Sequence, residues 1–101
     1  MSRHAAPPEP GQPHPLGSRV REGGVNFSVF SQHATRADLL LYDHVDDDQP
    51  ARVLPLQGDG HRTWHYWHVF VPGLRVGQVY AWRMHGPFDP RRGRQIGRAH
   101  V

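Results

Sequence analysis

The sequence predicts an all-β fold, a sandwich of about six or seven short antiparallel strands. Three observations lead to this class: apolar residues alternate with polar ones, turn residues recur about every 8 to 15 positions, and no window repeats with the helical period. A chain of 101 residues can bury one modest core, so one domain is expected. A (β/α)8 barrel, which needs about 250 residues, does not fit.

The strand signal is clearest in residues 24–31, whose sequence is GVNFSVFS. Val25, Phe27 and Val29 alternate there with polar residues, which predicts a strand with one buried face. Alternation, or a high content of β-branched and aromatic residues, predicts four more strands at residues 36–43, 51–56, 63–74 and 77–86. Turns separate them: three consecutive aspartates precede the second of these four, and a glycine-rich turn follows it.

Proline divides the chain into an N-terminal segment and an ordered part. Residues 1–15 hold five of the ten prolines, and proline lacks the N–H that a sheet interior requires. We therefore expect residues 1–15 to form a disordered, proline-rich lead-in. The β-sandwich should occupy residues 16–90, and residues 91–101 should form a linker.

The charge pattern gives little functional information. All 12 basic residues are arginines, and the formal net charge is only +3. Four arginines lie within residues 91–101; such a basic tail either binds phosphate or is a solvated linker, and the linker is the simpler interpretation. Nothing else in the chain is typical of a protein that reads bases or grooves, so no nucleic-acid partner is expected.

The chain also lacks the sequence features of exported and membrane proteins. It contains no cysteine, which excludes a disulfide framework and a thiolate metal site. Its first residues are polar and unlike a signal peptide, and no apolar run approaches the roughly 18 residues of a membrane span. We therefore expect a soluble, cytoplasmic protein that has no membrane partner.

Neither the histidines nor the carboxylates form a convincing catalytic or metal-binding pattern. His65 and His68 are three positions apart, which on one strand places them on opposite faces, and a metal needs three or four convergent ligands. Asp46, Asp47 and Asp48 lie in a polar turn, where nothing would desolvate one of them for acid–base catalysis. The sequence therefore predicts no catalytic residue, no metal site and no cofactor.

Aromatic residues form the one informative cluster. Trp64, Tyr66 and Trp67 fall within four positions, and Trp82 lies on the next predicted strand. Alternation places Trp64 and Tyr66 on one face and Trp67 on the other. Because sugars stack on exposed aromatic faces, Trp64 and Tyr66 are the candidate substrate-binding residues; the alternative is that they belong to the core. Trp67 and Trp82 are predicted to be core residues.

The motifs occur in an order that resembles a known family. They are the stretch Gly24-Val25-Asn26-Phe27, the run at residues 66–73, and residues 80–90, which end in HGPFDP. Over residues 15–95 the chain resembles the N-terminal domain of bacterial glycogen debranching enzymes of the isoamylase type, which are α-amylase-like glycoside hydrolases. The resemblance implies an immunoglobulin-like sandwich, often classed as a carbohydrate-binding module.

The resemblance also implies the function of a longer protein. In the family a (β/α)8 barrel follows the sandwich and hydrolyses α-1,6 branch linkages in glycogen-type glucans, with an Asp nucleophile, a Glu acid/base and a third Asp that all lie in the barrel. No position here matches those motifs, and Asp89 resembles the segment that leads toward the barrel. We expect an N-terminal domain that is inactive alone and whose partner is an α-glucan, glycogen or limit dextrin. The alternative is a stand-alone glucan-binding module.

Residues 96–101, with the sequence IGRAHV, depart from the family pattern that continues to Gln95. The family places an aromatic residue where this chain has Ile96. IGRAHV resembles the translation of a common sequencing adapter, ATC GGA AGA GCA CAC GTC, whose next codon is a stop. We therefore expect residues 96–101 to be an artefact, and residues 91–95 to lead toward a catalytic barrel that is absent here. The alternative is a natural tail.

Overall fold

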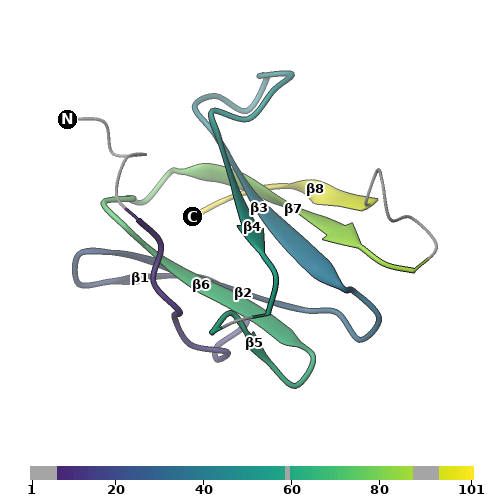
Figure 1. The fold of residues 1–101 in the computed structure, drawn as a ribbon. Coiled ribbons are helices and arrows are strands. Elements are labelled where there is room, and N and C mark those ends of the chain that lie inside the picture. The colour runs from purple at the N-terminus through teal and green to yellow at the C-terminus, as the bar shows by residue number, and fades with distance from the viewer. Residues whose placement is uncertain (1–6, 59, 88–93) are drawn as a thin grey trace.

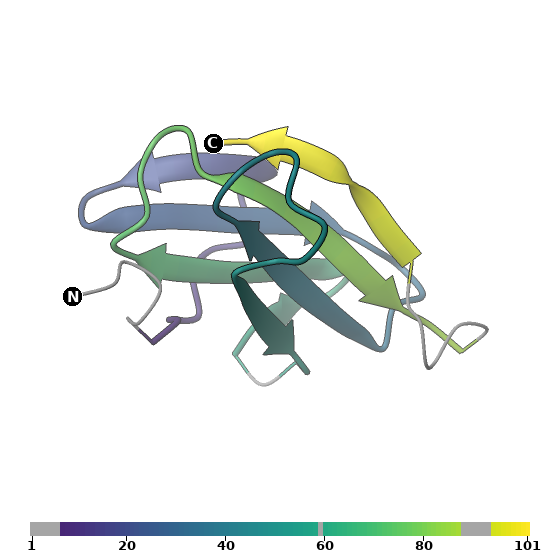
Figure 2. The ribbon, with the colours of Figure 1, turned by 90° about the horizontal axis from the view of Figure 1, so that it is seen from above.

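Two four-stranded antiparallel sheets stack face to face in a computed structural model that describes residues 7–58, 60–87 and 94–101 (Figures 1 and 2). The first sheet has the order β1-β2-β6-β5, and the second has the order β4-β3-β7-β8. The strands are β1 (Gly17–Arg21), β2 (Gly24–Phe30), β3 (Arg36–Tyr42), β4 (Arg52–Leu56), β5 (Arg62–Thr63), β6 (Tyr66–Pro72), β7 (Val79–His85) and β8 (Arg94–His100). The predicted all-β sandwich is confirmed.

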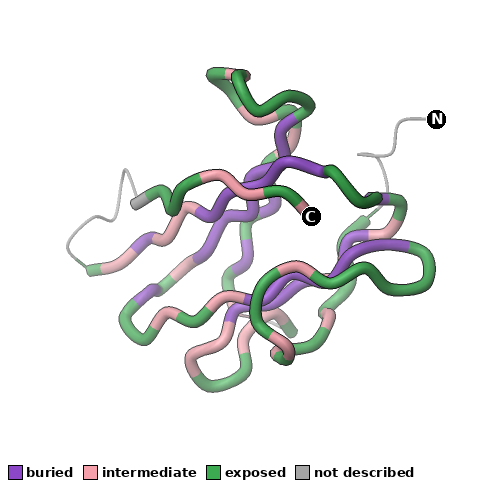
Figure 3. The backbone as a smooth tube through the Cα atoms, turned by 180° about the vertical axis from the view of Figure 1, so that it is seen from behind, coloured by how far each residue is buried: buried purple, intermediate pink, exposed green. Residues whose placement is uncertain are grey.

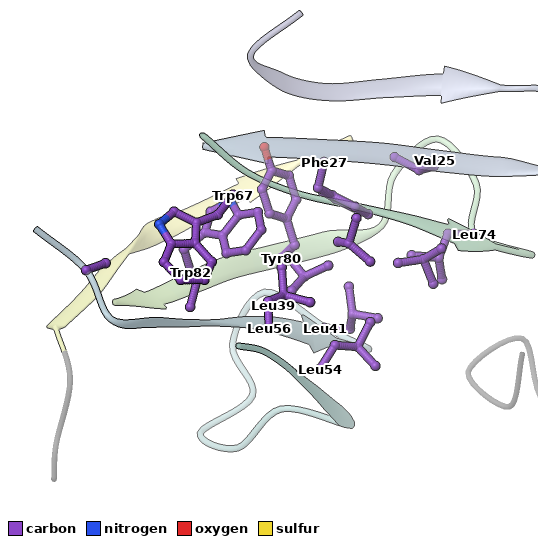
Figure 4. Packing of buried hydrophobic residues seen from close by; sticks show 14 residues of the cluster. Val25, Phe27, Leu39, Leu41, Leu54, Leu56, Trp67, Leu74, Tyr80 and Trp82 are labelled. Carbon is purple, nitrogen blue, oxygen red and sulfur yellow. The ribbon is translucent and has the colours of Figure 1, made fainter. Parts of the chain in front are cut away.

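The core lies between the two sheets and follows from strand register. Phe27 pairs with Val69 across β2 and β6, and Leu39 pairs with Trp82 across β3 and β7. Every second residue of these strands points inward, so the sheets interdigitate; Phe27, for example, meets the ring of Tyr80 edge to face at 4.8 Å (Figure 4). The buried residues follow the strands of both sheets in Figure 3. Other fully buried members are Val25, Leu41, Leu56, Trp67 and Val71.

One predicted strand, at residues 63–74, is a hairpin in the structure. It divides into the short strand β5 and the longer strand β6, which are joined by a two-residue loop of Trp64 and His65. Trp64 has a φ of 57°, and a positive φ at the first loop position is the geometry of tight hairpin turns. Aromatic content predicted an extended strand here because it does not report a turn made without glycine, proline or asparagine.

Residues 7–15 are held against the first sheet, where the sequence predicted a disordered lead-in: Glu9 pairs with β6 at its free edge, and Gln12 and Pro13 bind side chains of the outer face. Residues 1–6 lie outside the described part. We call residues 7–15 the N-terminal strap. Glu9 exchanges two backbone hydrogen bonds with Phe70, at 2.8 and 2.9 Å. Gly11 has a φ of 74°, and a Cβ there would come within 2.7 Å of the backbone nitrogen of Phe70. The strap therefore lies in close contact with the sheet.

The polar face of the first sheet holds this strap. The amide of Asn26 accepts a hydrogen bond from the backbone of Gln12 at 2.8 Å and donates one back at 3.0 Å. Ser28 Oγ donates to the carbonyl of Pro13 at 2.6 Å, and the side chain of His68 donates to the carbonyl of Pro10 at 2.7 Å. Proline cannot donate a backbone hydrogen bond, but its carbonyl still accepts, and this explains why a proline-rich segment can be fixed to a sheet.

The C-terminal residues form a strand where the sequence predicted a linker. β8 pairs antiparallel with β7, with a bulge between Tyr80 and Trp82, and extends the sandwich past the expected limit at residue 90. The backbone of any segment without proline can pair with an open strand edge. The pairing therefore does not address the origin of residues 96–101, and the adapter hypothesis stays a prediction.

Candidate functional site

Five aromatic rings gather at one end of the outer face of the first sheet. Phe30 and Tyr66 are cross-strand partners at the end of β2 and the start of β6. The β5–β6 loop adds Trp64 and His65, and the N-terminal strap adds His14. We call these five residues the aromatic patch. Three separate segments build it, and the hairpin brings Trp64 beside Tyr66.

The rings of the aromatic patch contact one another at inclined angles. Trp64 and Tyr66 have ring centroids 5.8 Å apart and planes inclined by 52°. Phe30 lies edge to face against both, at 5.9 Å from Trp64 and 5.5 Å from Tyr66. His65 lies 4.2 Å from Trp64, and His14 meets Tyr66 at 4.8 Å. Such edge contacts restrict the motion of the rings.

Exposure separates the aromatic patch from the core. Trp64 is 67% exposed and Phe30 is 45% exposed, whereas Trp67 and Trp82 are only 1% and 5% exposed. Trp67 and Trp82 are therefore core residues, as predicted. Tyr66 is half-buried between His14 and its neighbours. An exposed cluster of large apolar rings on a small domain commonly marks a binding surface.

The backbone of Trp64 is in a conformation that bulky side chains seldom adopt. Its φ of 57° lies in the left-handed region, which for a residue other than glycine costs about 1–2 kcal/mol. The surrounding contacts hold it there: Arg62 Nε donates to the carbonyl of Trp64 at 2.9 Å, and the amide of Ser31 donates to the carbonyl of His65 at 2.8 Å. Strain of this kind is concentrated at functional sites.

The sequence predicted two of the five members of the aromatic patch. Trp64 and Tyr66 do lie together, although a turn unites them and not the alternation of one strand. Sequence reasoning missed Phe30, His14 and His65. Phe30 lies on the outward phase near the end of the predicted strand 24–31, and this was the available signal. Nothing local reveals that the strap carries His14 to Tyr66.

The buried carboxylate of the described residues is Asp38, which has a structural environment. His85 Nε2 lies 2.8 Å from Asp38 Oδ2, and Arg36 Nε lies 3.1 Å from Asp38 Oδ1. A carboxylate paired in this way is neutralised and has no second carboxylate beside it for acid–base work. The predicted turn aspartates lie elsewhere, and Asp47 accepts a hydrogen bond from the amide of His44 at 3.0 Å.

The histidines that the structure describes do not converge on a metal geometry. His65 belongs to the aromatic patch, while His68 is buried beneath the strap with Nε2 2.8 Å from Thr63 Oγ1. Among the described residues no group of three or more histidine, aspartate or glutamate side chains is placed to hold a metal ion.

Burial lowers the pKa of Arg52, which still remains protonated at neutral pH. No described helix is long and apolar enough to cross a membrane.

Comparisons with known proteins give a consistent result. The family model of carbohydrate-binding module 48 (isoamylase N-terminal domain) matches residues 15–97. The chain is 43% identical to a glycogen debranching enzyme of Erwinia tasmaniensis over 93 residues, which cover 90% of the chain and 13% of that relative. It is 40% identical to a glycogen operon protein GlgX homolog of Mycobacterium bovis, over 83% of the chain and 11% of the relative. It is 37% identical to chloroplastic isoamylase 1 of Oryza sativa subsp. japonica, over 90% of the chain and 12% of the relative. The chain thus spans about an eighth of the length of these curated relatives.

Proposed function

Because this chain belongs to the carbohydrate-binding module 48 family of isoamylase N-terminal domains, we propose that it is the N-terminal sandwich of an enzyme that hydrolyses α-1,6 branch linkages in glycogen-type glucans. Relatives named glycogen debranching enzyme and isoamylase support the reaction. The sandwich would contribute glucan binding, and the chemistry would belong to another part of the protein. The cytoplasmic location expected from the sequence stays a prediction.

The observation that carries the binding role is the exposed, strained Trp64 in the aromatic patch. The tight hairpin turn requires the φ of 57°, but glycine or asparagine would adopt it at lower cost, so the turn does not explain a tryptophan that is 67% exposed. Its indole offers a flat apolar face to the C–H surface of a sugar ring. Tyr66 supplies a second ring and a hydroxyl that can hydrogen-bond to sugar hydroxyls.

The inclination of the two rings favours an α-glucan. Successive sugars of an extended β-1,4-glucan form a nearly flat ribbon, which matches coplanar aromatic rings. Successive sugars of an α-1,4-glucan turn relative to one another. Because the planes of Trp64 and Tyr66 are inclined by 52°, both rings can stack only on a chain that turns. Maltoheptaose should therefore bind, and cellohexaose should bind more weakly.

The sandwich itself offers no catalytic pair among its described carboxylates. Asp38 forms an ion pair with Arg36 and lies within hydrogen-bond distance of His85, and the aspartates of the β3–β4 loop are exposed or half-buried. A glycosidase requires two carboxyl groups at a defined separation, one of them with a raised pKa. We therefore expect no hydrolysis of glycogen or of limit dextrin by the 101-residue chain alone.

Calorimetric titration of the chain with maltoheptaose tests the binding role. We expect a Kd of about 1 mM or tighter, which corresponds to about −4 kcal/mol. Trp64→Ala should weaken binding about tenfold, ~1.4 kcal/mol, because it removes the stacking face. Val76→Ala is the matched control, since Val76 is an exposed apolar residue, 75% accessible, outside the aromatic patch. Wild-type affinity in Trp64→Ala would refute the assignment of the site.

Sequencing the source DNA beyond the codon for Gln95 tests the enzyme role. We expect the reading frame to continue with an aromatic residue in place of Ile96, followed by a region that encodes alternating strands and helices of a barrel, about 250 residues. A genome that encodes IGRAHV followed by a stop codon would contradict the enzyme role and the adapter hypothesis together. The alternative of a stand-alone glucan-binding module would then be the hypothesis to test.

A further inference from the structure

A groove lies on the first sheet away from the aromatic patch, between the N-terminal strap and the turn that joins β1 to β2. It has a volume of about 500 Å³, within the usual range for small-molecule sites. We call it the strap groove. Its lining includes Glu9, Gly11, Arg21, Glu22, Asn26 and Phe70.

Backbone contacts fix the wall that the strap contributes to the strap groove. Glu9 and Phe70 form their two backbone hydrogen bonds on one side, and Gln12 is tied to Asn26 on the other. Between them Gly11 lies so close to the sheet that a Cβ would come within 2.6 Å of Asn26 Oδ1. The groove is therefore preformed and does not depend on a loop closing over a ligand.

The strap groove contains an aromatic ring. A Cβ added to Gly24 would lie 2.8 Å from Cζ of Phe70, so the ring of Phe70 extends over this glycine. Phe70 is half-buried, which leaves part of the ring accessible. Gly24 thus makes room for a flat apolar surface next to the strap.

Charged side chains border this ring. Glu9, Arg21 and Glu22 are exposed, and none of the hydrogen bonds or ion pairs within the described residues involves their side chains. Two carboxylates accept hydrogen bonds from hydroxyl groups, and a guanidinium donates to hydroxyl or ring oxygens. Two carboxylates disfavour a phosphate, and a calcium ion requires six or more oxygen ligands. A neutral polyhydroxylated ligand fits this combination best.

We propose that the strap groove is a second carbohydrate subsite, which binds a hexose unit through the ring of Phe70 and the side chains of Glu22 and Arg21. The choice of an α-glucan as its source rests on the proposed function. Phe70 lies four residues along β6 from Tyr66, about 13 Å on a strand. One glucan chain of several units can therefore contact the aromatic patch and the strap groove together, which raises its effective affinity without any further contact.

Amide NMR of the full 101-residue chain with maltoheptaose tests this inference. We expect shift changes at Gly11, Glu22 and Phe70 in addition to those at Trp64 and His65. Maltose, which is too short to reach both places, should perturb the two regions with weaker and separate saturation curves. Changes confined to the aromatic patch would overturn the inference and leave the proposed function intact. Changes confined to the strap groove would support the inference and refute the aromatic patch as a glucan-binding site.

A pair of variants tests the energetic contribution of the strap groove. Glu22→Ala should weaken maltoheptaose binding about three- to tenfold, ~0.7–1.4 kcal/mol, and leave the shift changes at Trp64 in place. Asp48→Ala is the control, since it removes an exposed carboxylate from the β3–β4 loop and should leave affinity unchanged. Unchanged affinity in both variants would overturn the inference. Shift changes at Glu22 with calcium chloride or inorganic phosphate, but not with maltoheptaose, would assign the groove to an ion.

Discussion

Trp64 and Trp67 are three positions apart, yet their exposed fractions are 67% and 1%. Trp67 lies in β6 on the inward phase and packs in the core between the sheets, while the guanidinium of Arg62 lies 4.8 Å from the centre of its ring. Trp64 lies at the tip of the hairpin, where its ring packs against other rings of the aromatic patch. The comparison shows that strand phase determines the environment of Trp67, whereas the turn determines that of Trp64.

The two tryptophans also differ in their contribution to stability. Burial of the large indole of Trp67 stabilises the sandwich, since it removes a large apolar area from water. Trp64 gains little from burial and has a backbone φ that favours glycine. We therefore expect Trp67 to determine whether the domain folds and Trp64 to determine what it binds.

The largest expected effect is that of Trp67→Ala. Removal of a fully buried indole should lower the free energy of unfolding by about 3–5 kcal/mol, much of the total for a small domain. Urea denaturation followed by circular dichroism measures this loss, with Trp64→Ala as the matched variant. Equal destabilisation by the two variants would contradict the division between core and patch.

A smaller effect is expected for Gly11→Ala, which tests whether the strap is held against the sheet. A methyl group there collides with backbone atoms of Val69 and Phe70, so the variant should lose about 1–3 kcal/mol and the amide protection of Phe70 in hydrogen exchange. Gly23→Ala is the control that separates the effect of the steric collision from the effect of the positive φ, because Gly23 has a similar φ of 85° but open space around it. Identical behaviour of the two variants would show that contact with the sheet is unimportant.

The smallest expected effect is that of Trp64→Gly. Glycine adopts the observed φ without strain, so the free energy of unfolding should rise by about 1 kcal/mol while affinity for maltoheptaose falls. Thermal unfolding and a binding titration of the same variant would show whether stability rises while affinity falls. A loss of both stability and binding would indicate that the ring contacts of Trp64 outweigh its backbone strain.

The fold class and the core could be predicted because they depend on local alternation. The inward phase of residues 24–31 identified Val25 and Phe27, and the position of Trp67 in phase with Val69 and Val71 identified it as buried. The strand count was approximate: residues 63–74 conceal a turn, and residues 94–100 pair through backbone groups that carry no side-chain signal.

The strap and the strap groove could not be predicted from local patterns. Proline-rich composition indicates that residues 7–15 cannot form a strand interior, and this is compatible both with disorder and with an extended segment held by its carbonyls. The donors to those carbonyls, Asn26, Ser28 and His68, occupy the alternating polar phase that is normally solvated. Only their positions in the folded sheet show that they bind the strap.

The sequence by itself determined that this chain is a β-sandwich with a buried Trp67, because the side-chain period of a strand is a local property. It left Trp64 open between a binding residue and a core residue. The tertiary structure alone decided which rings join Trp64, how far their planes are inclined, and that the strap and Phe70 form the strap groove. These features depend on contacts between residues distant in the chain, such as His14 with Tyr66, and no local pattern encodes such contacts.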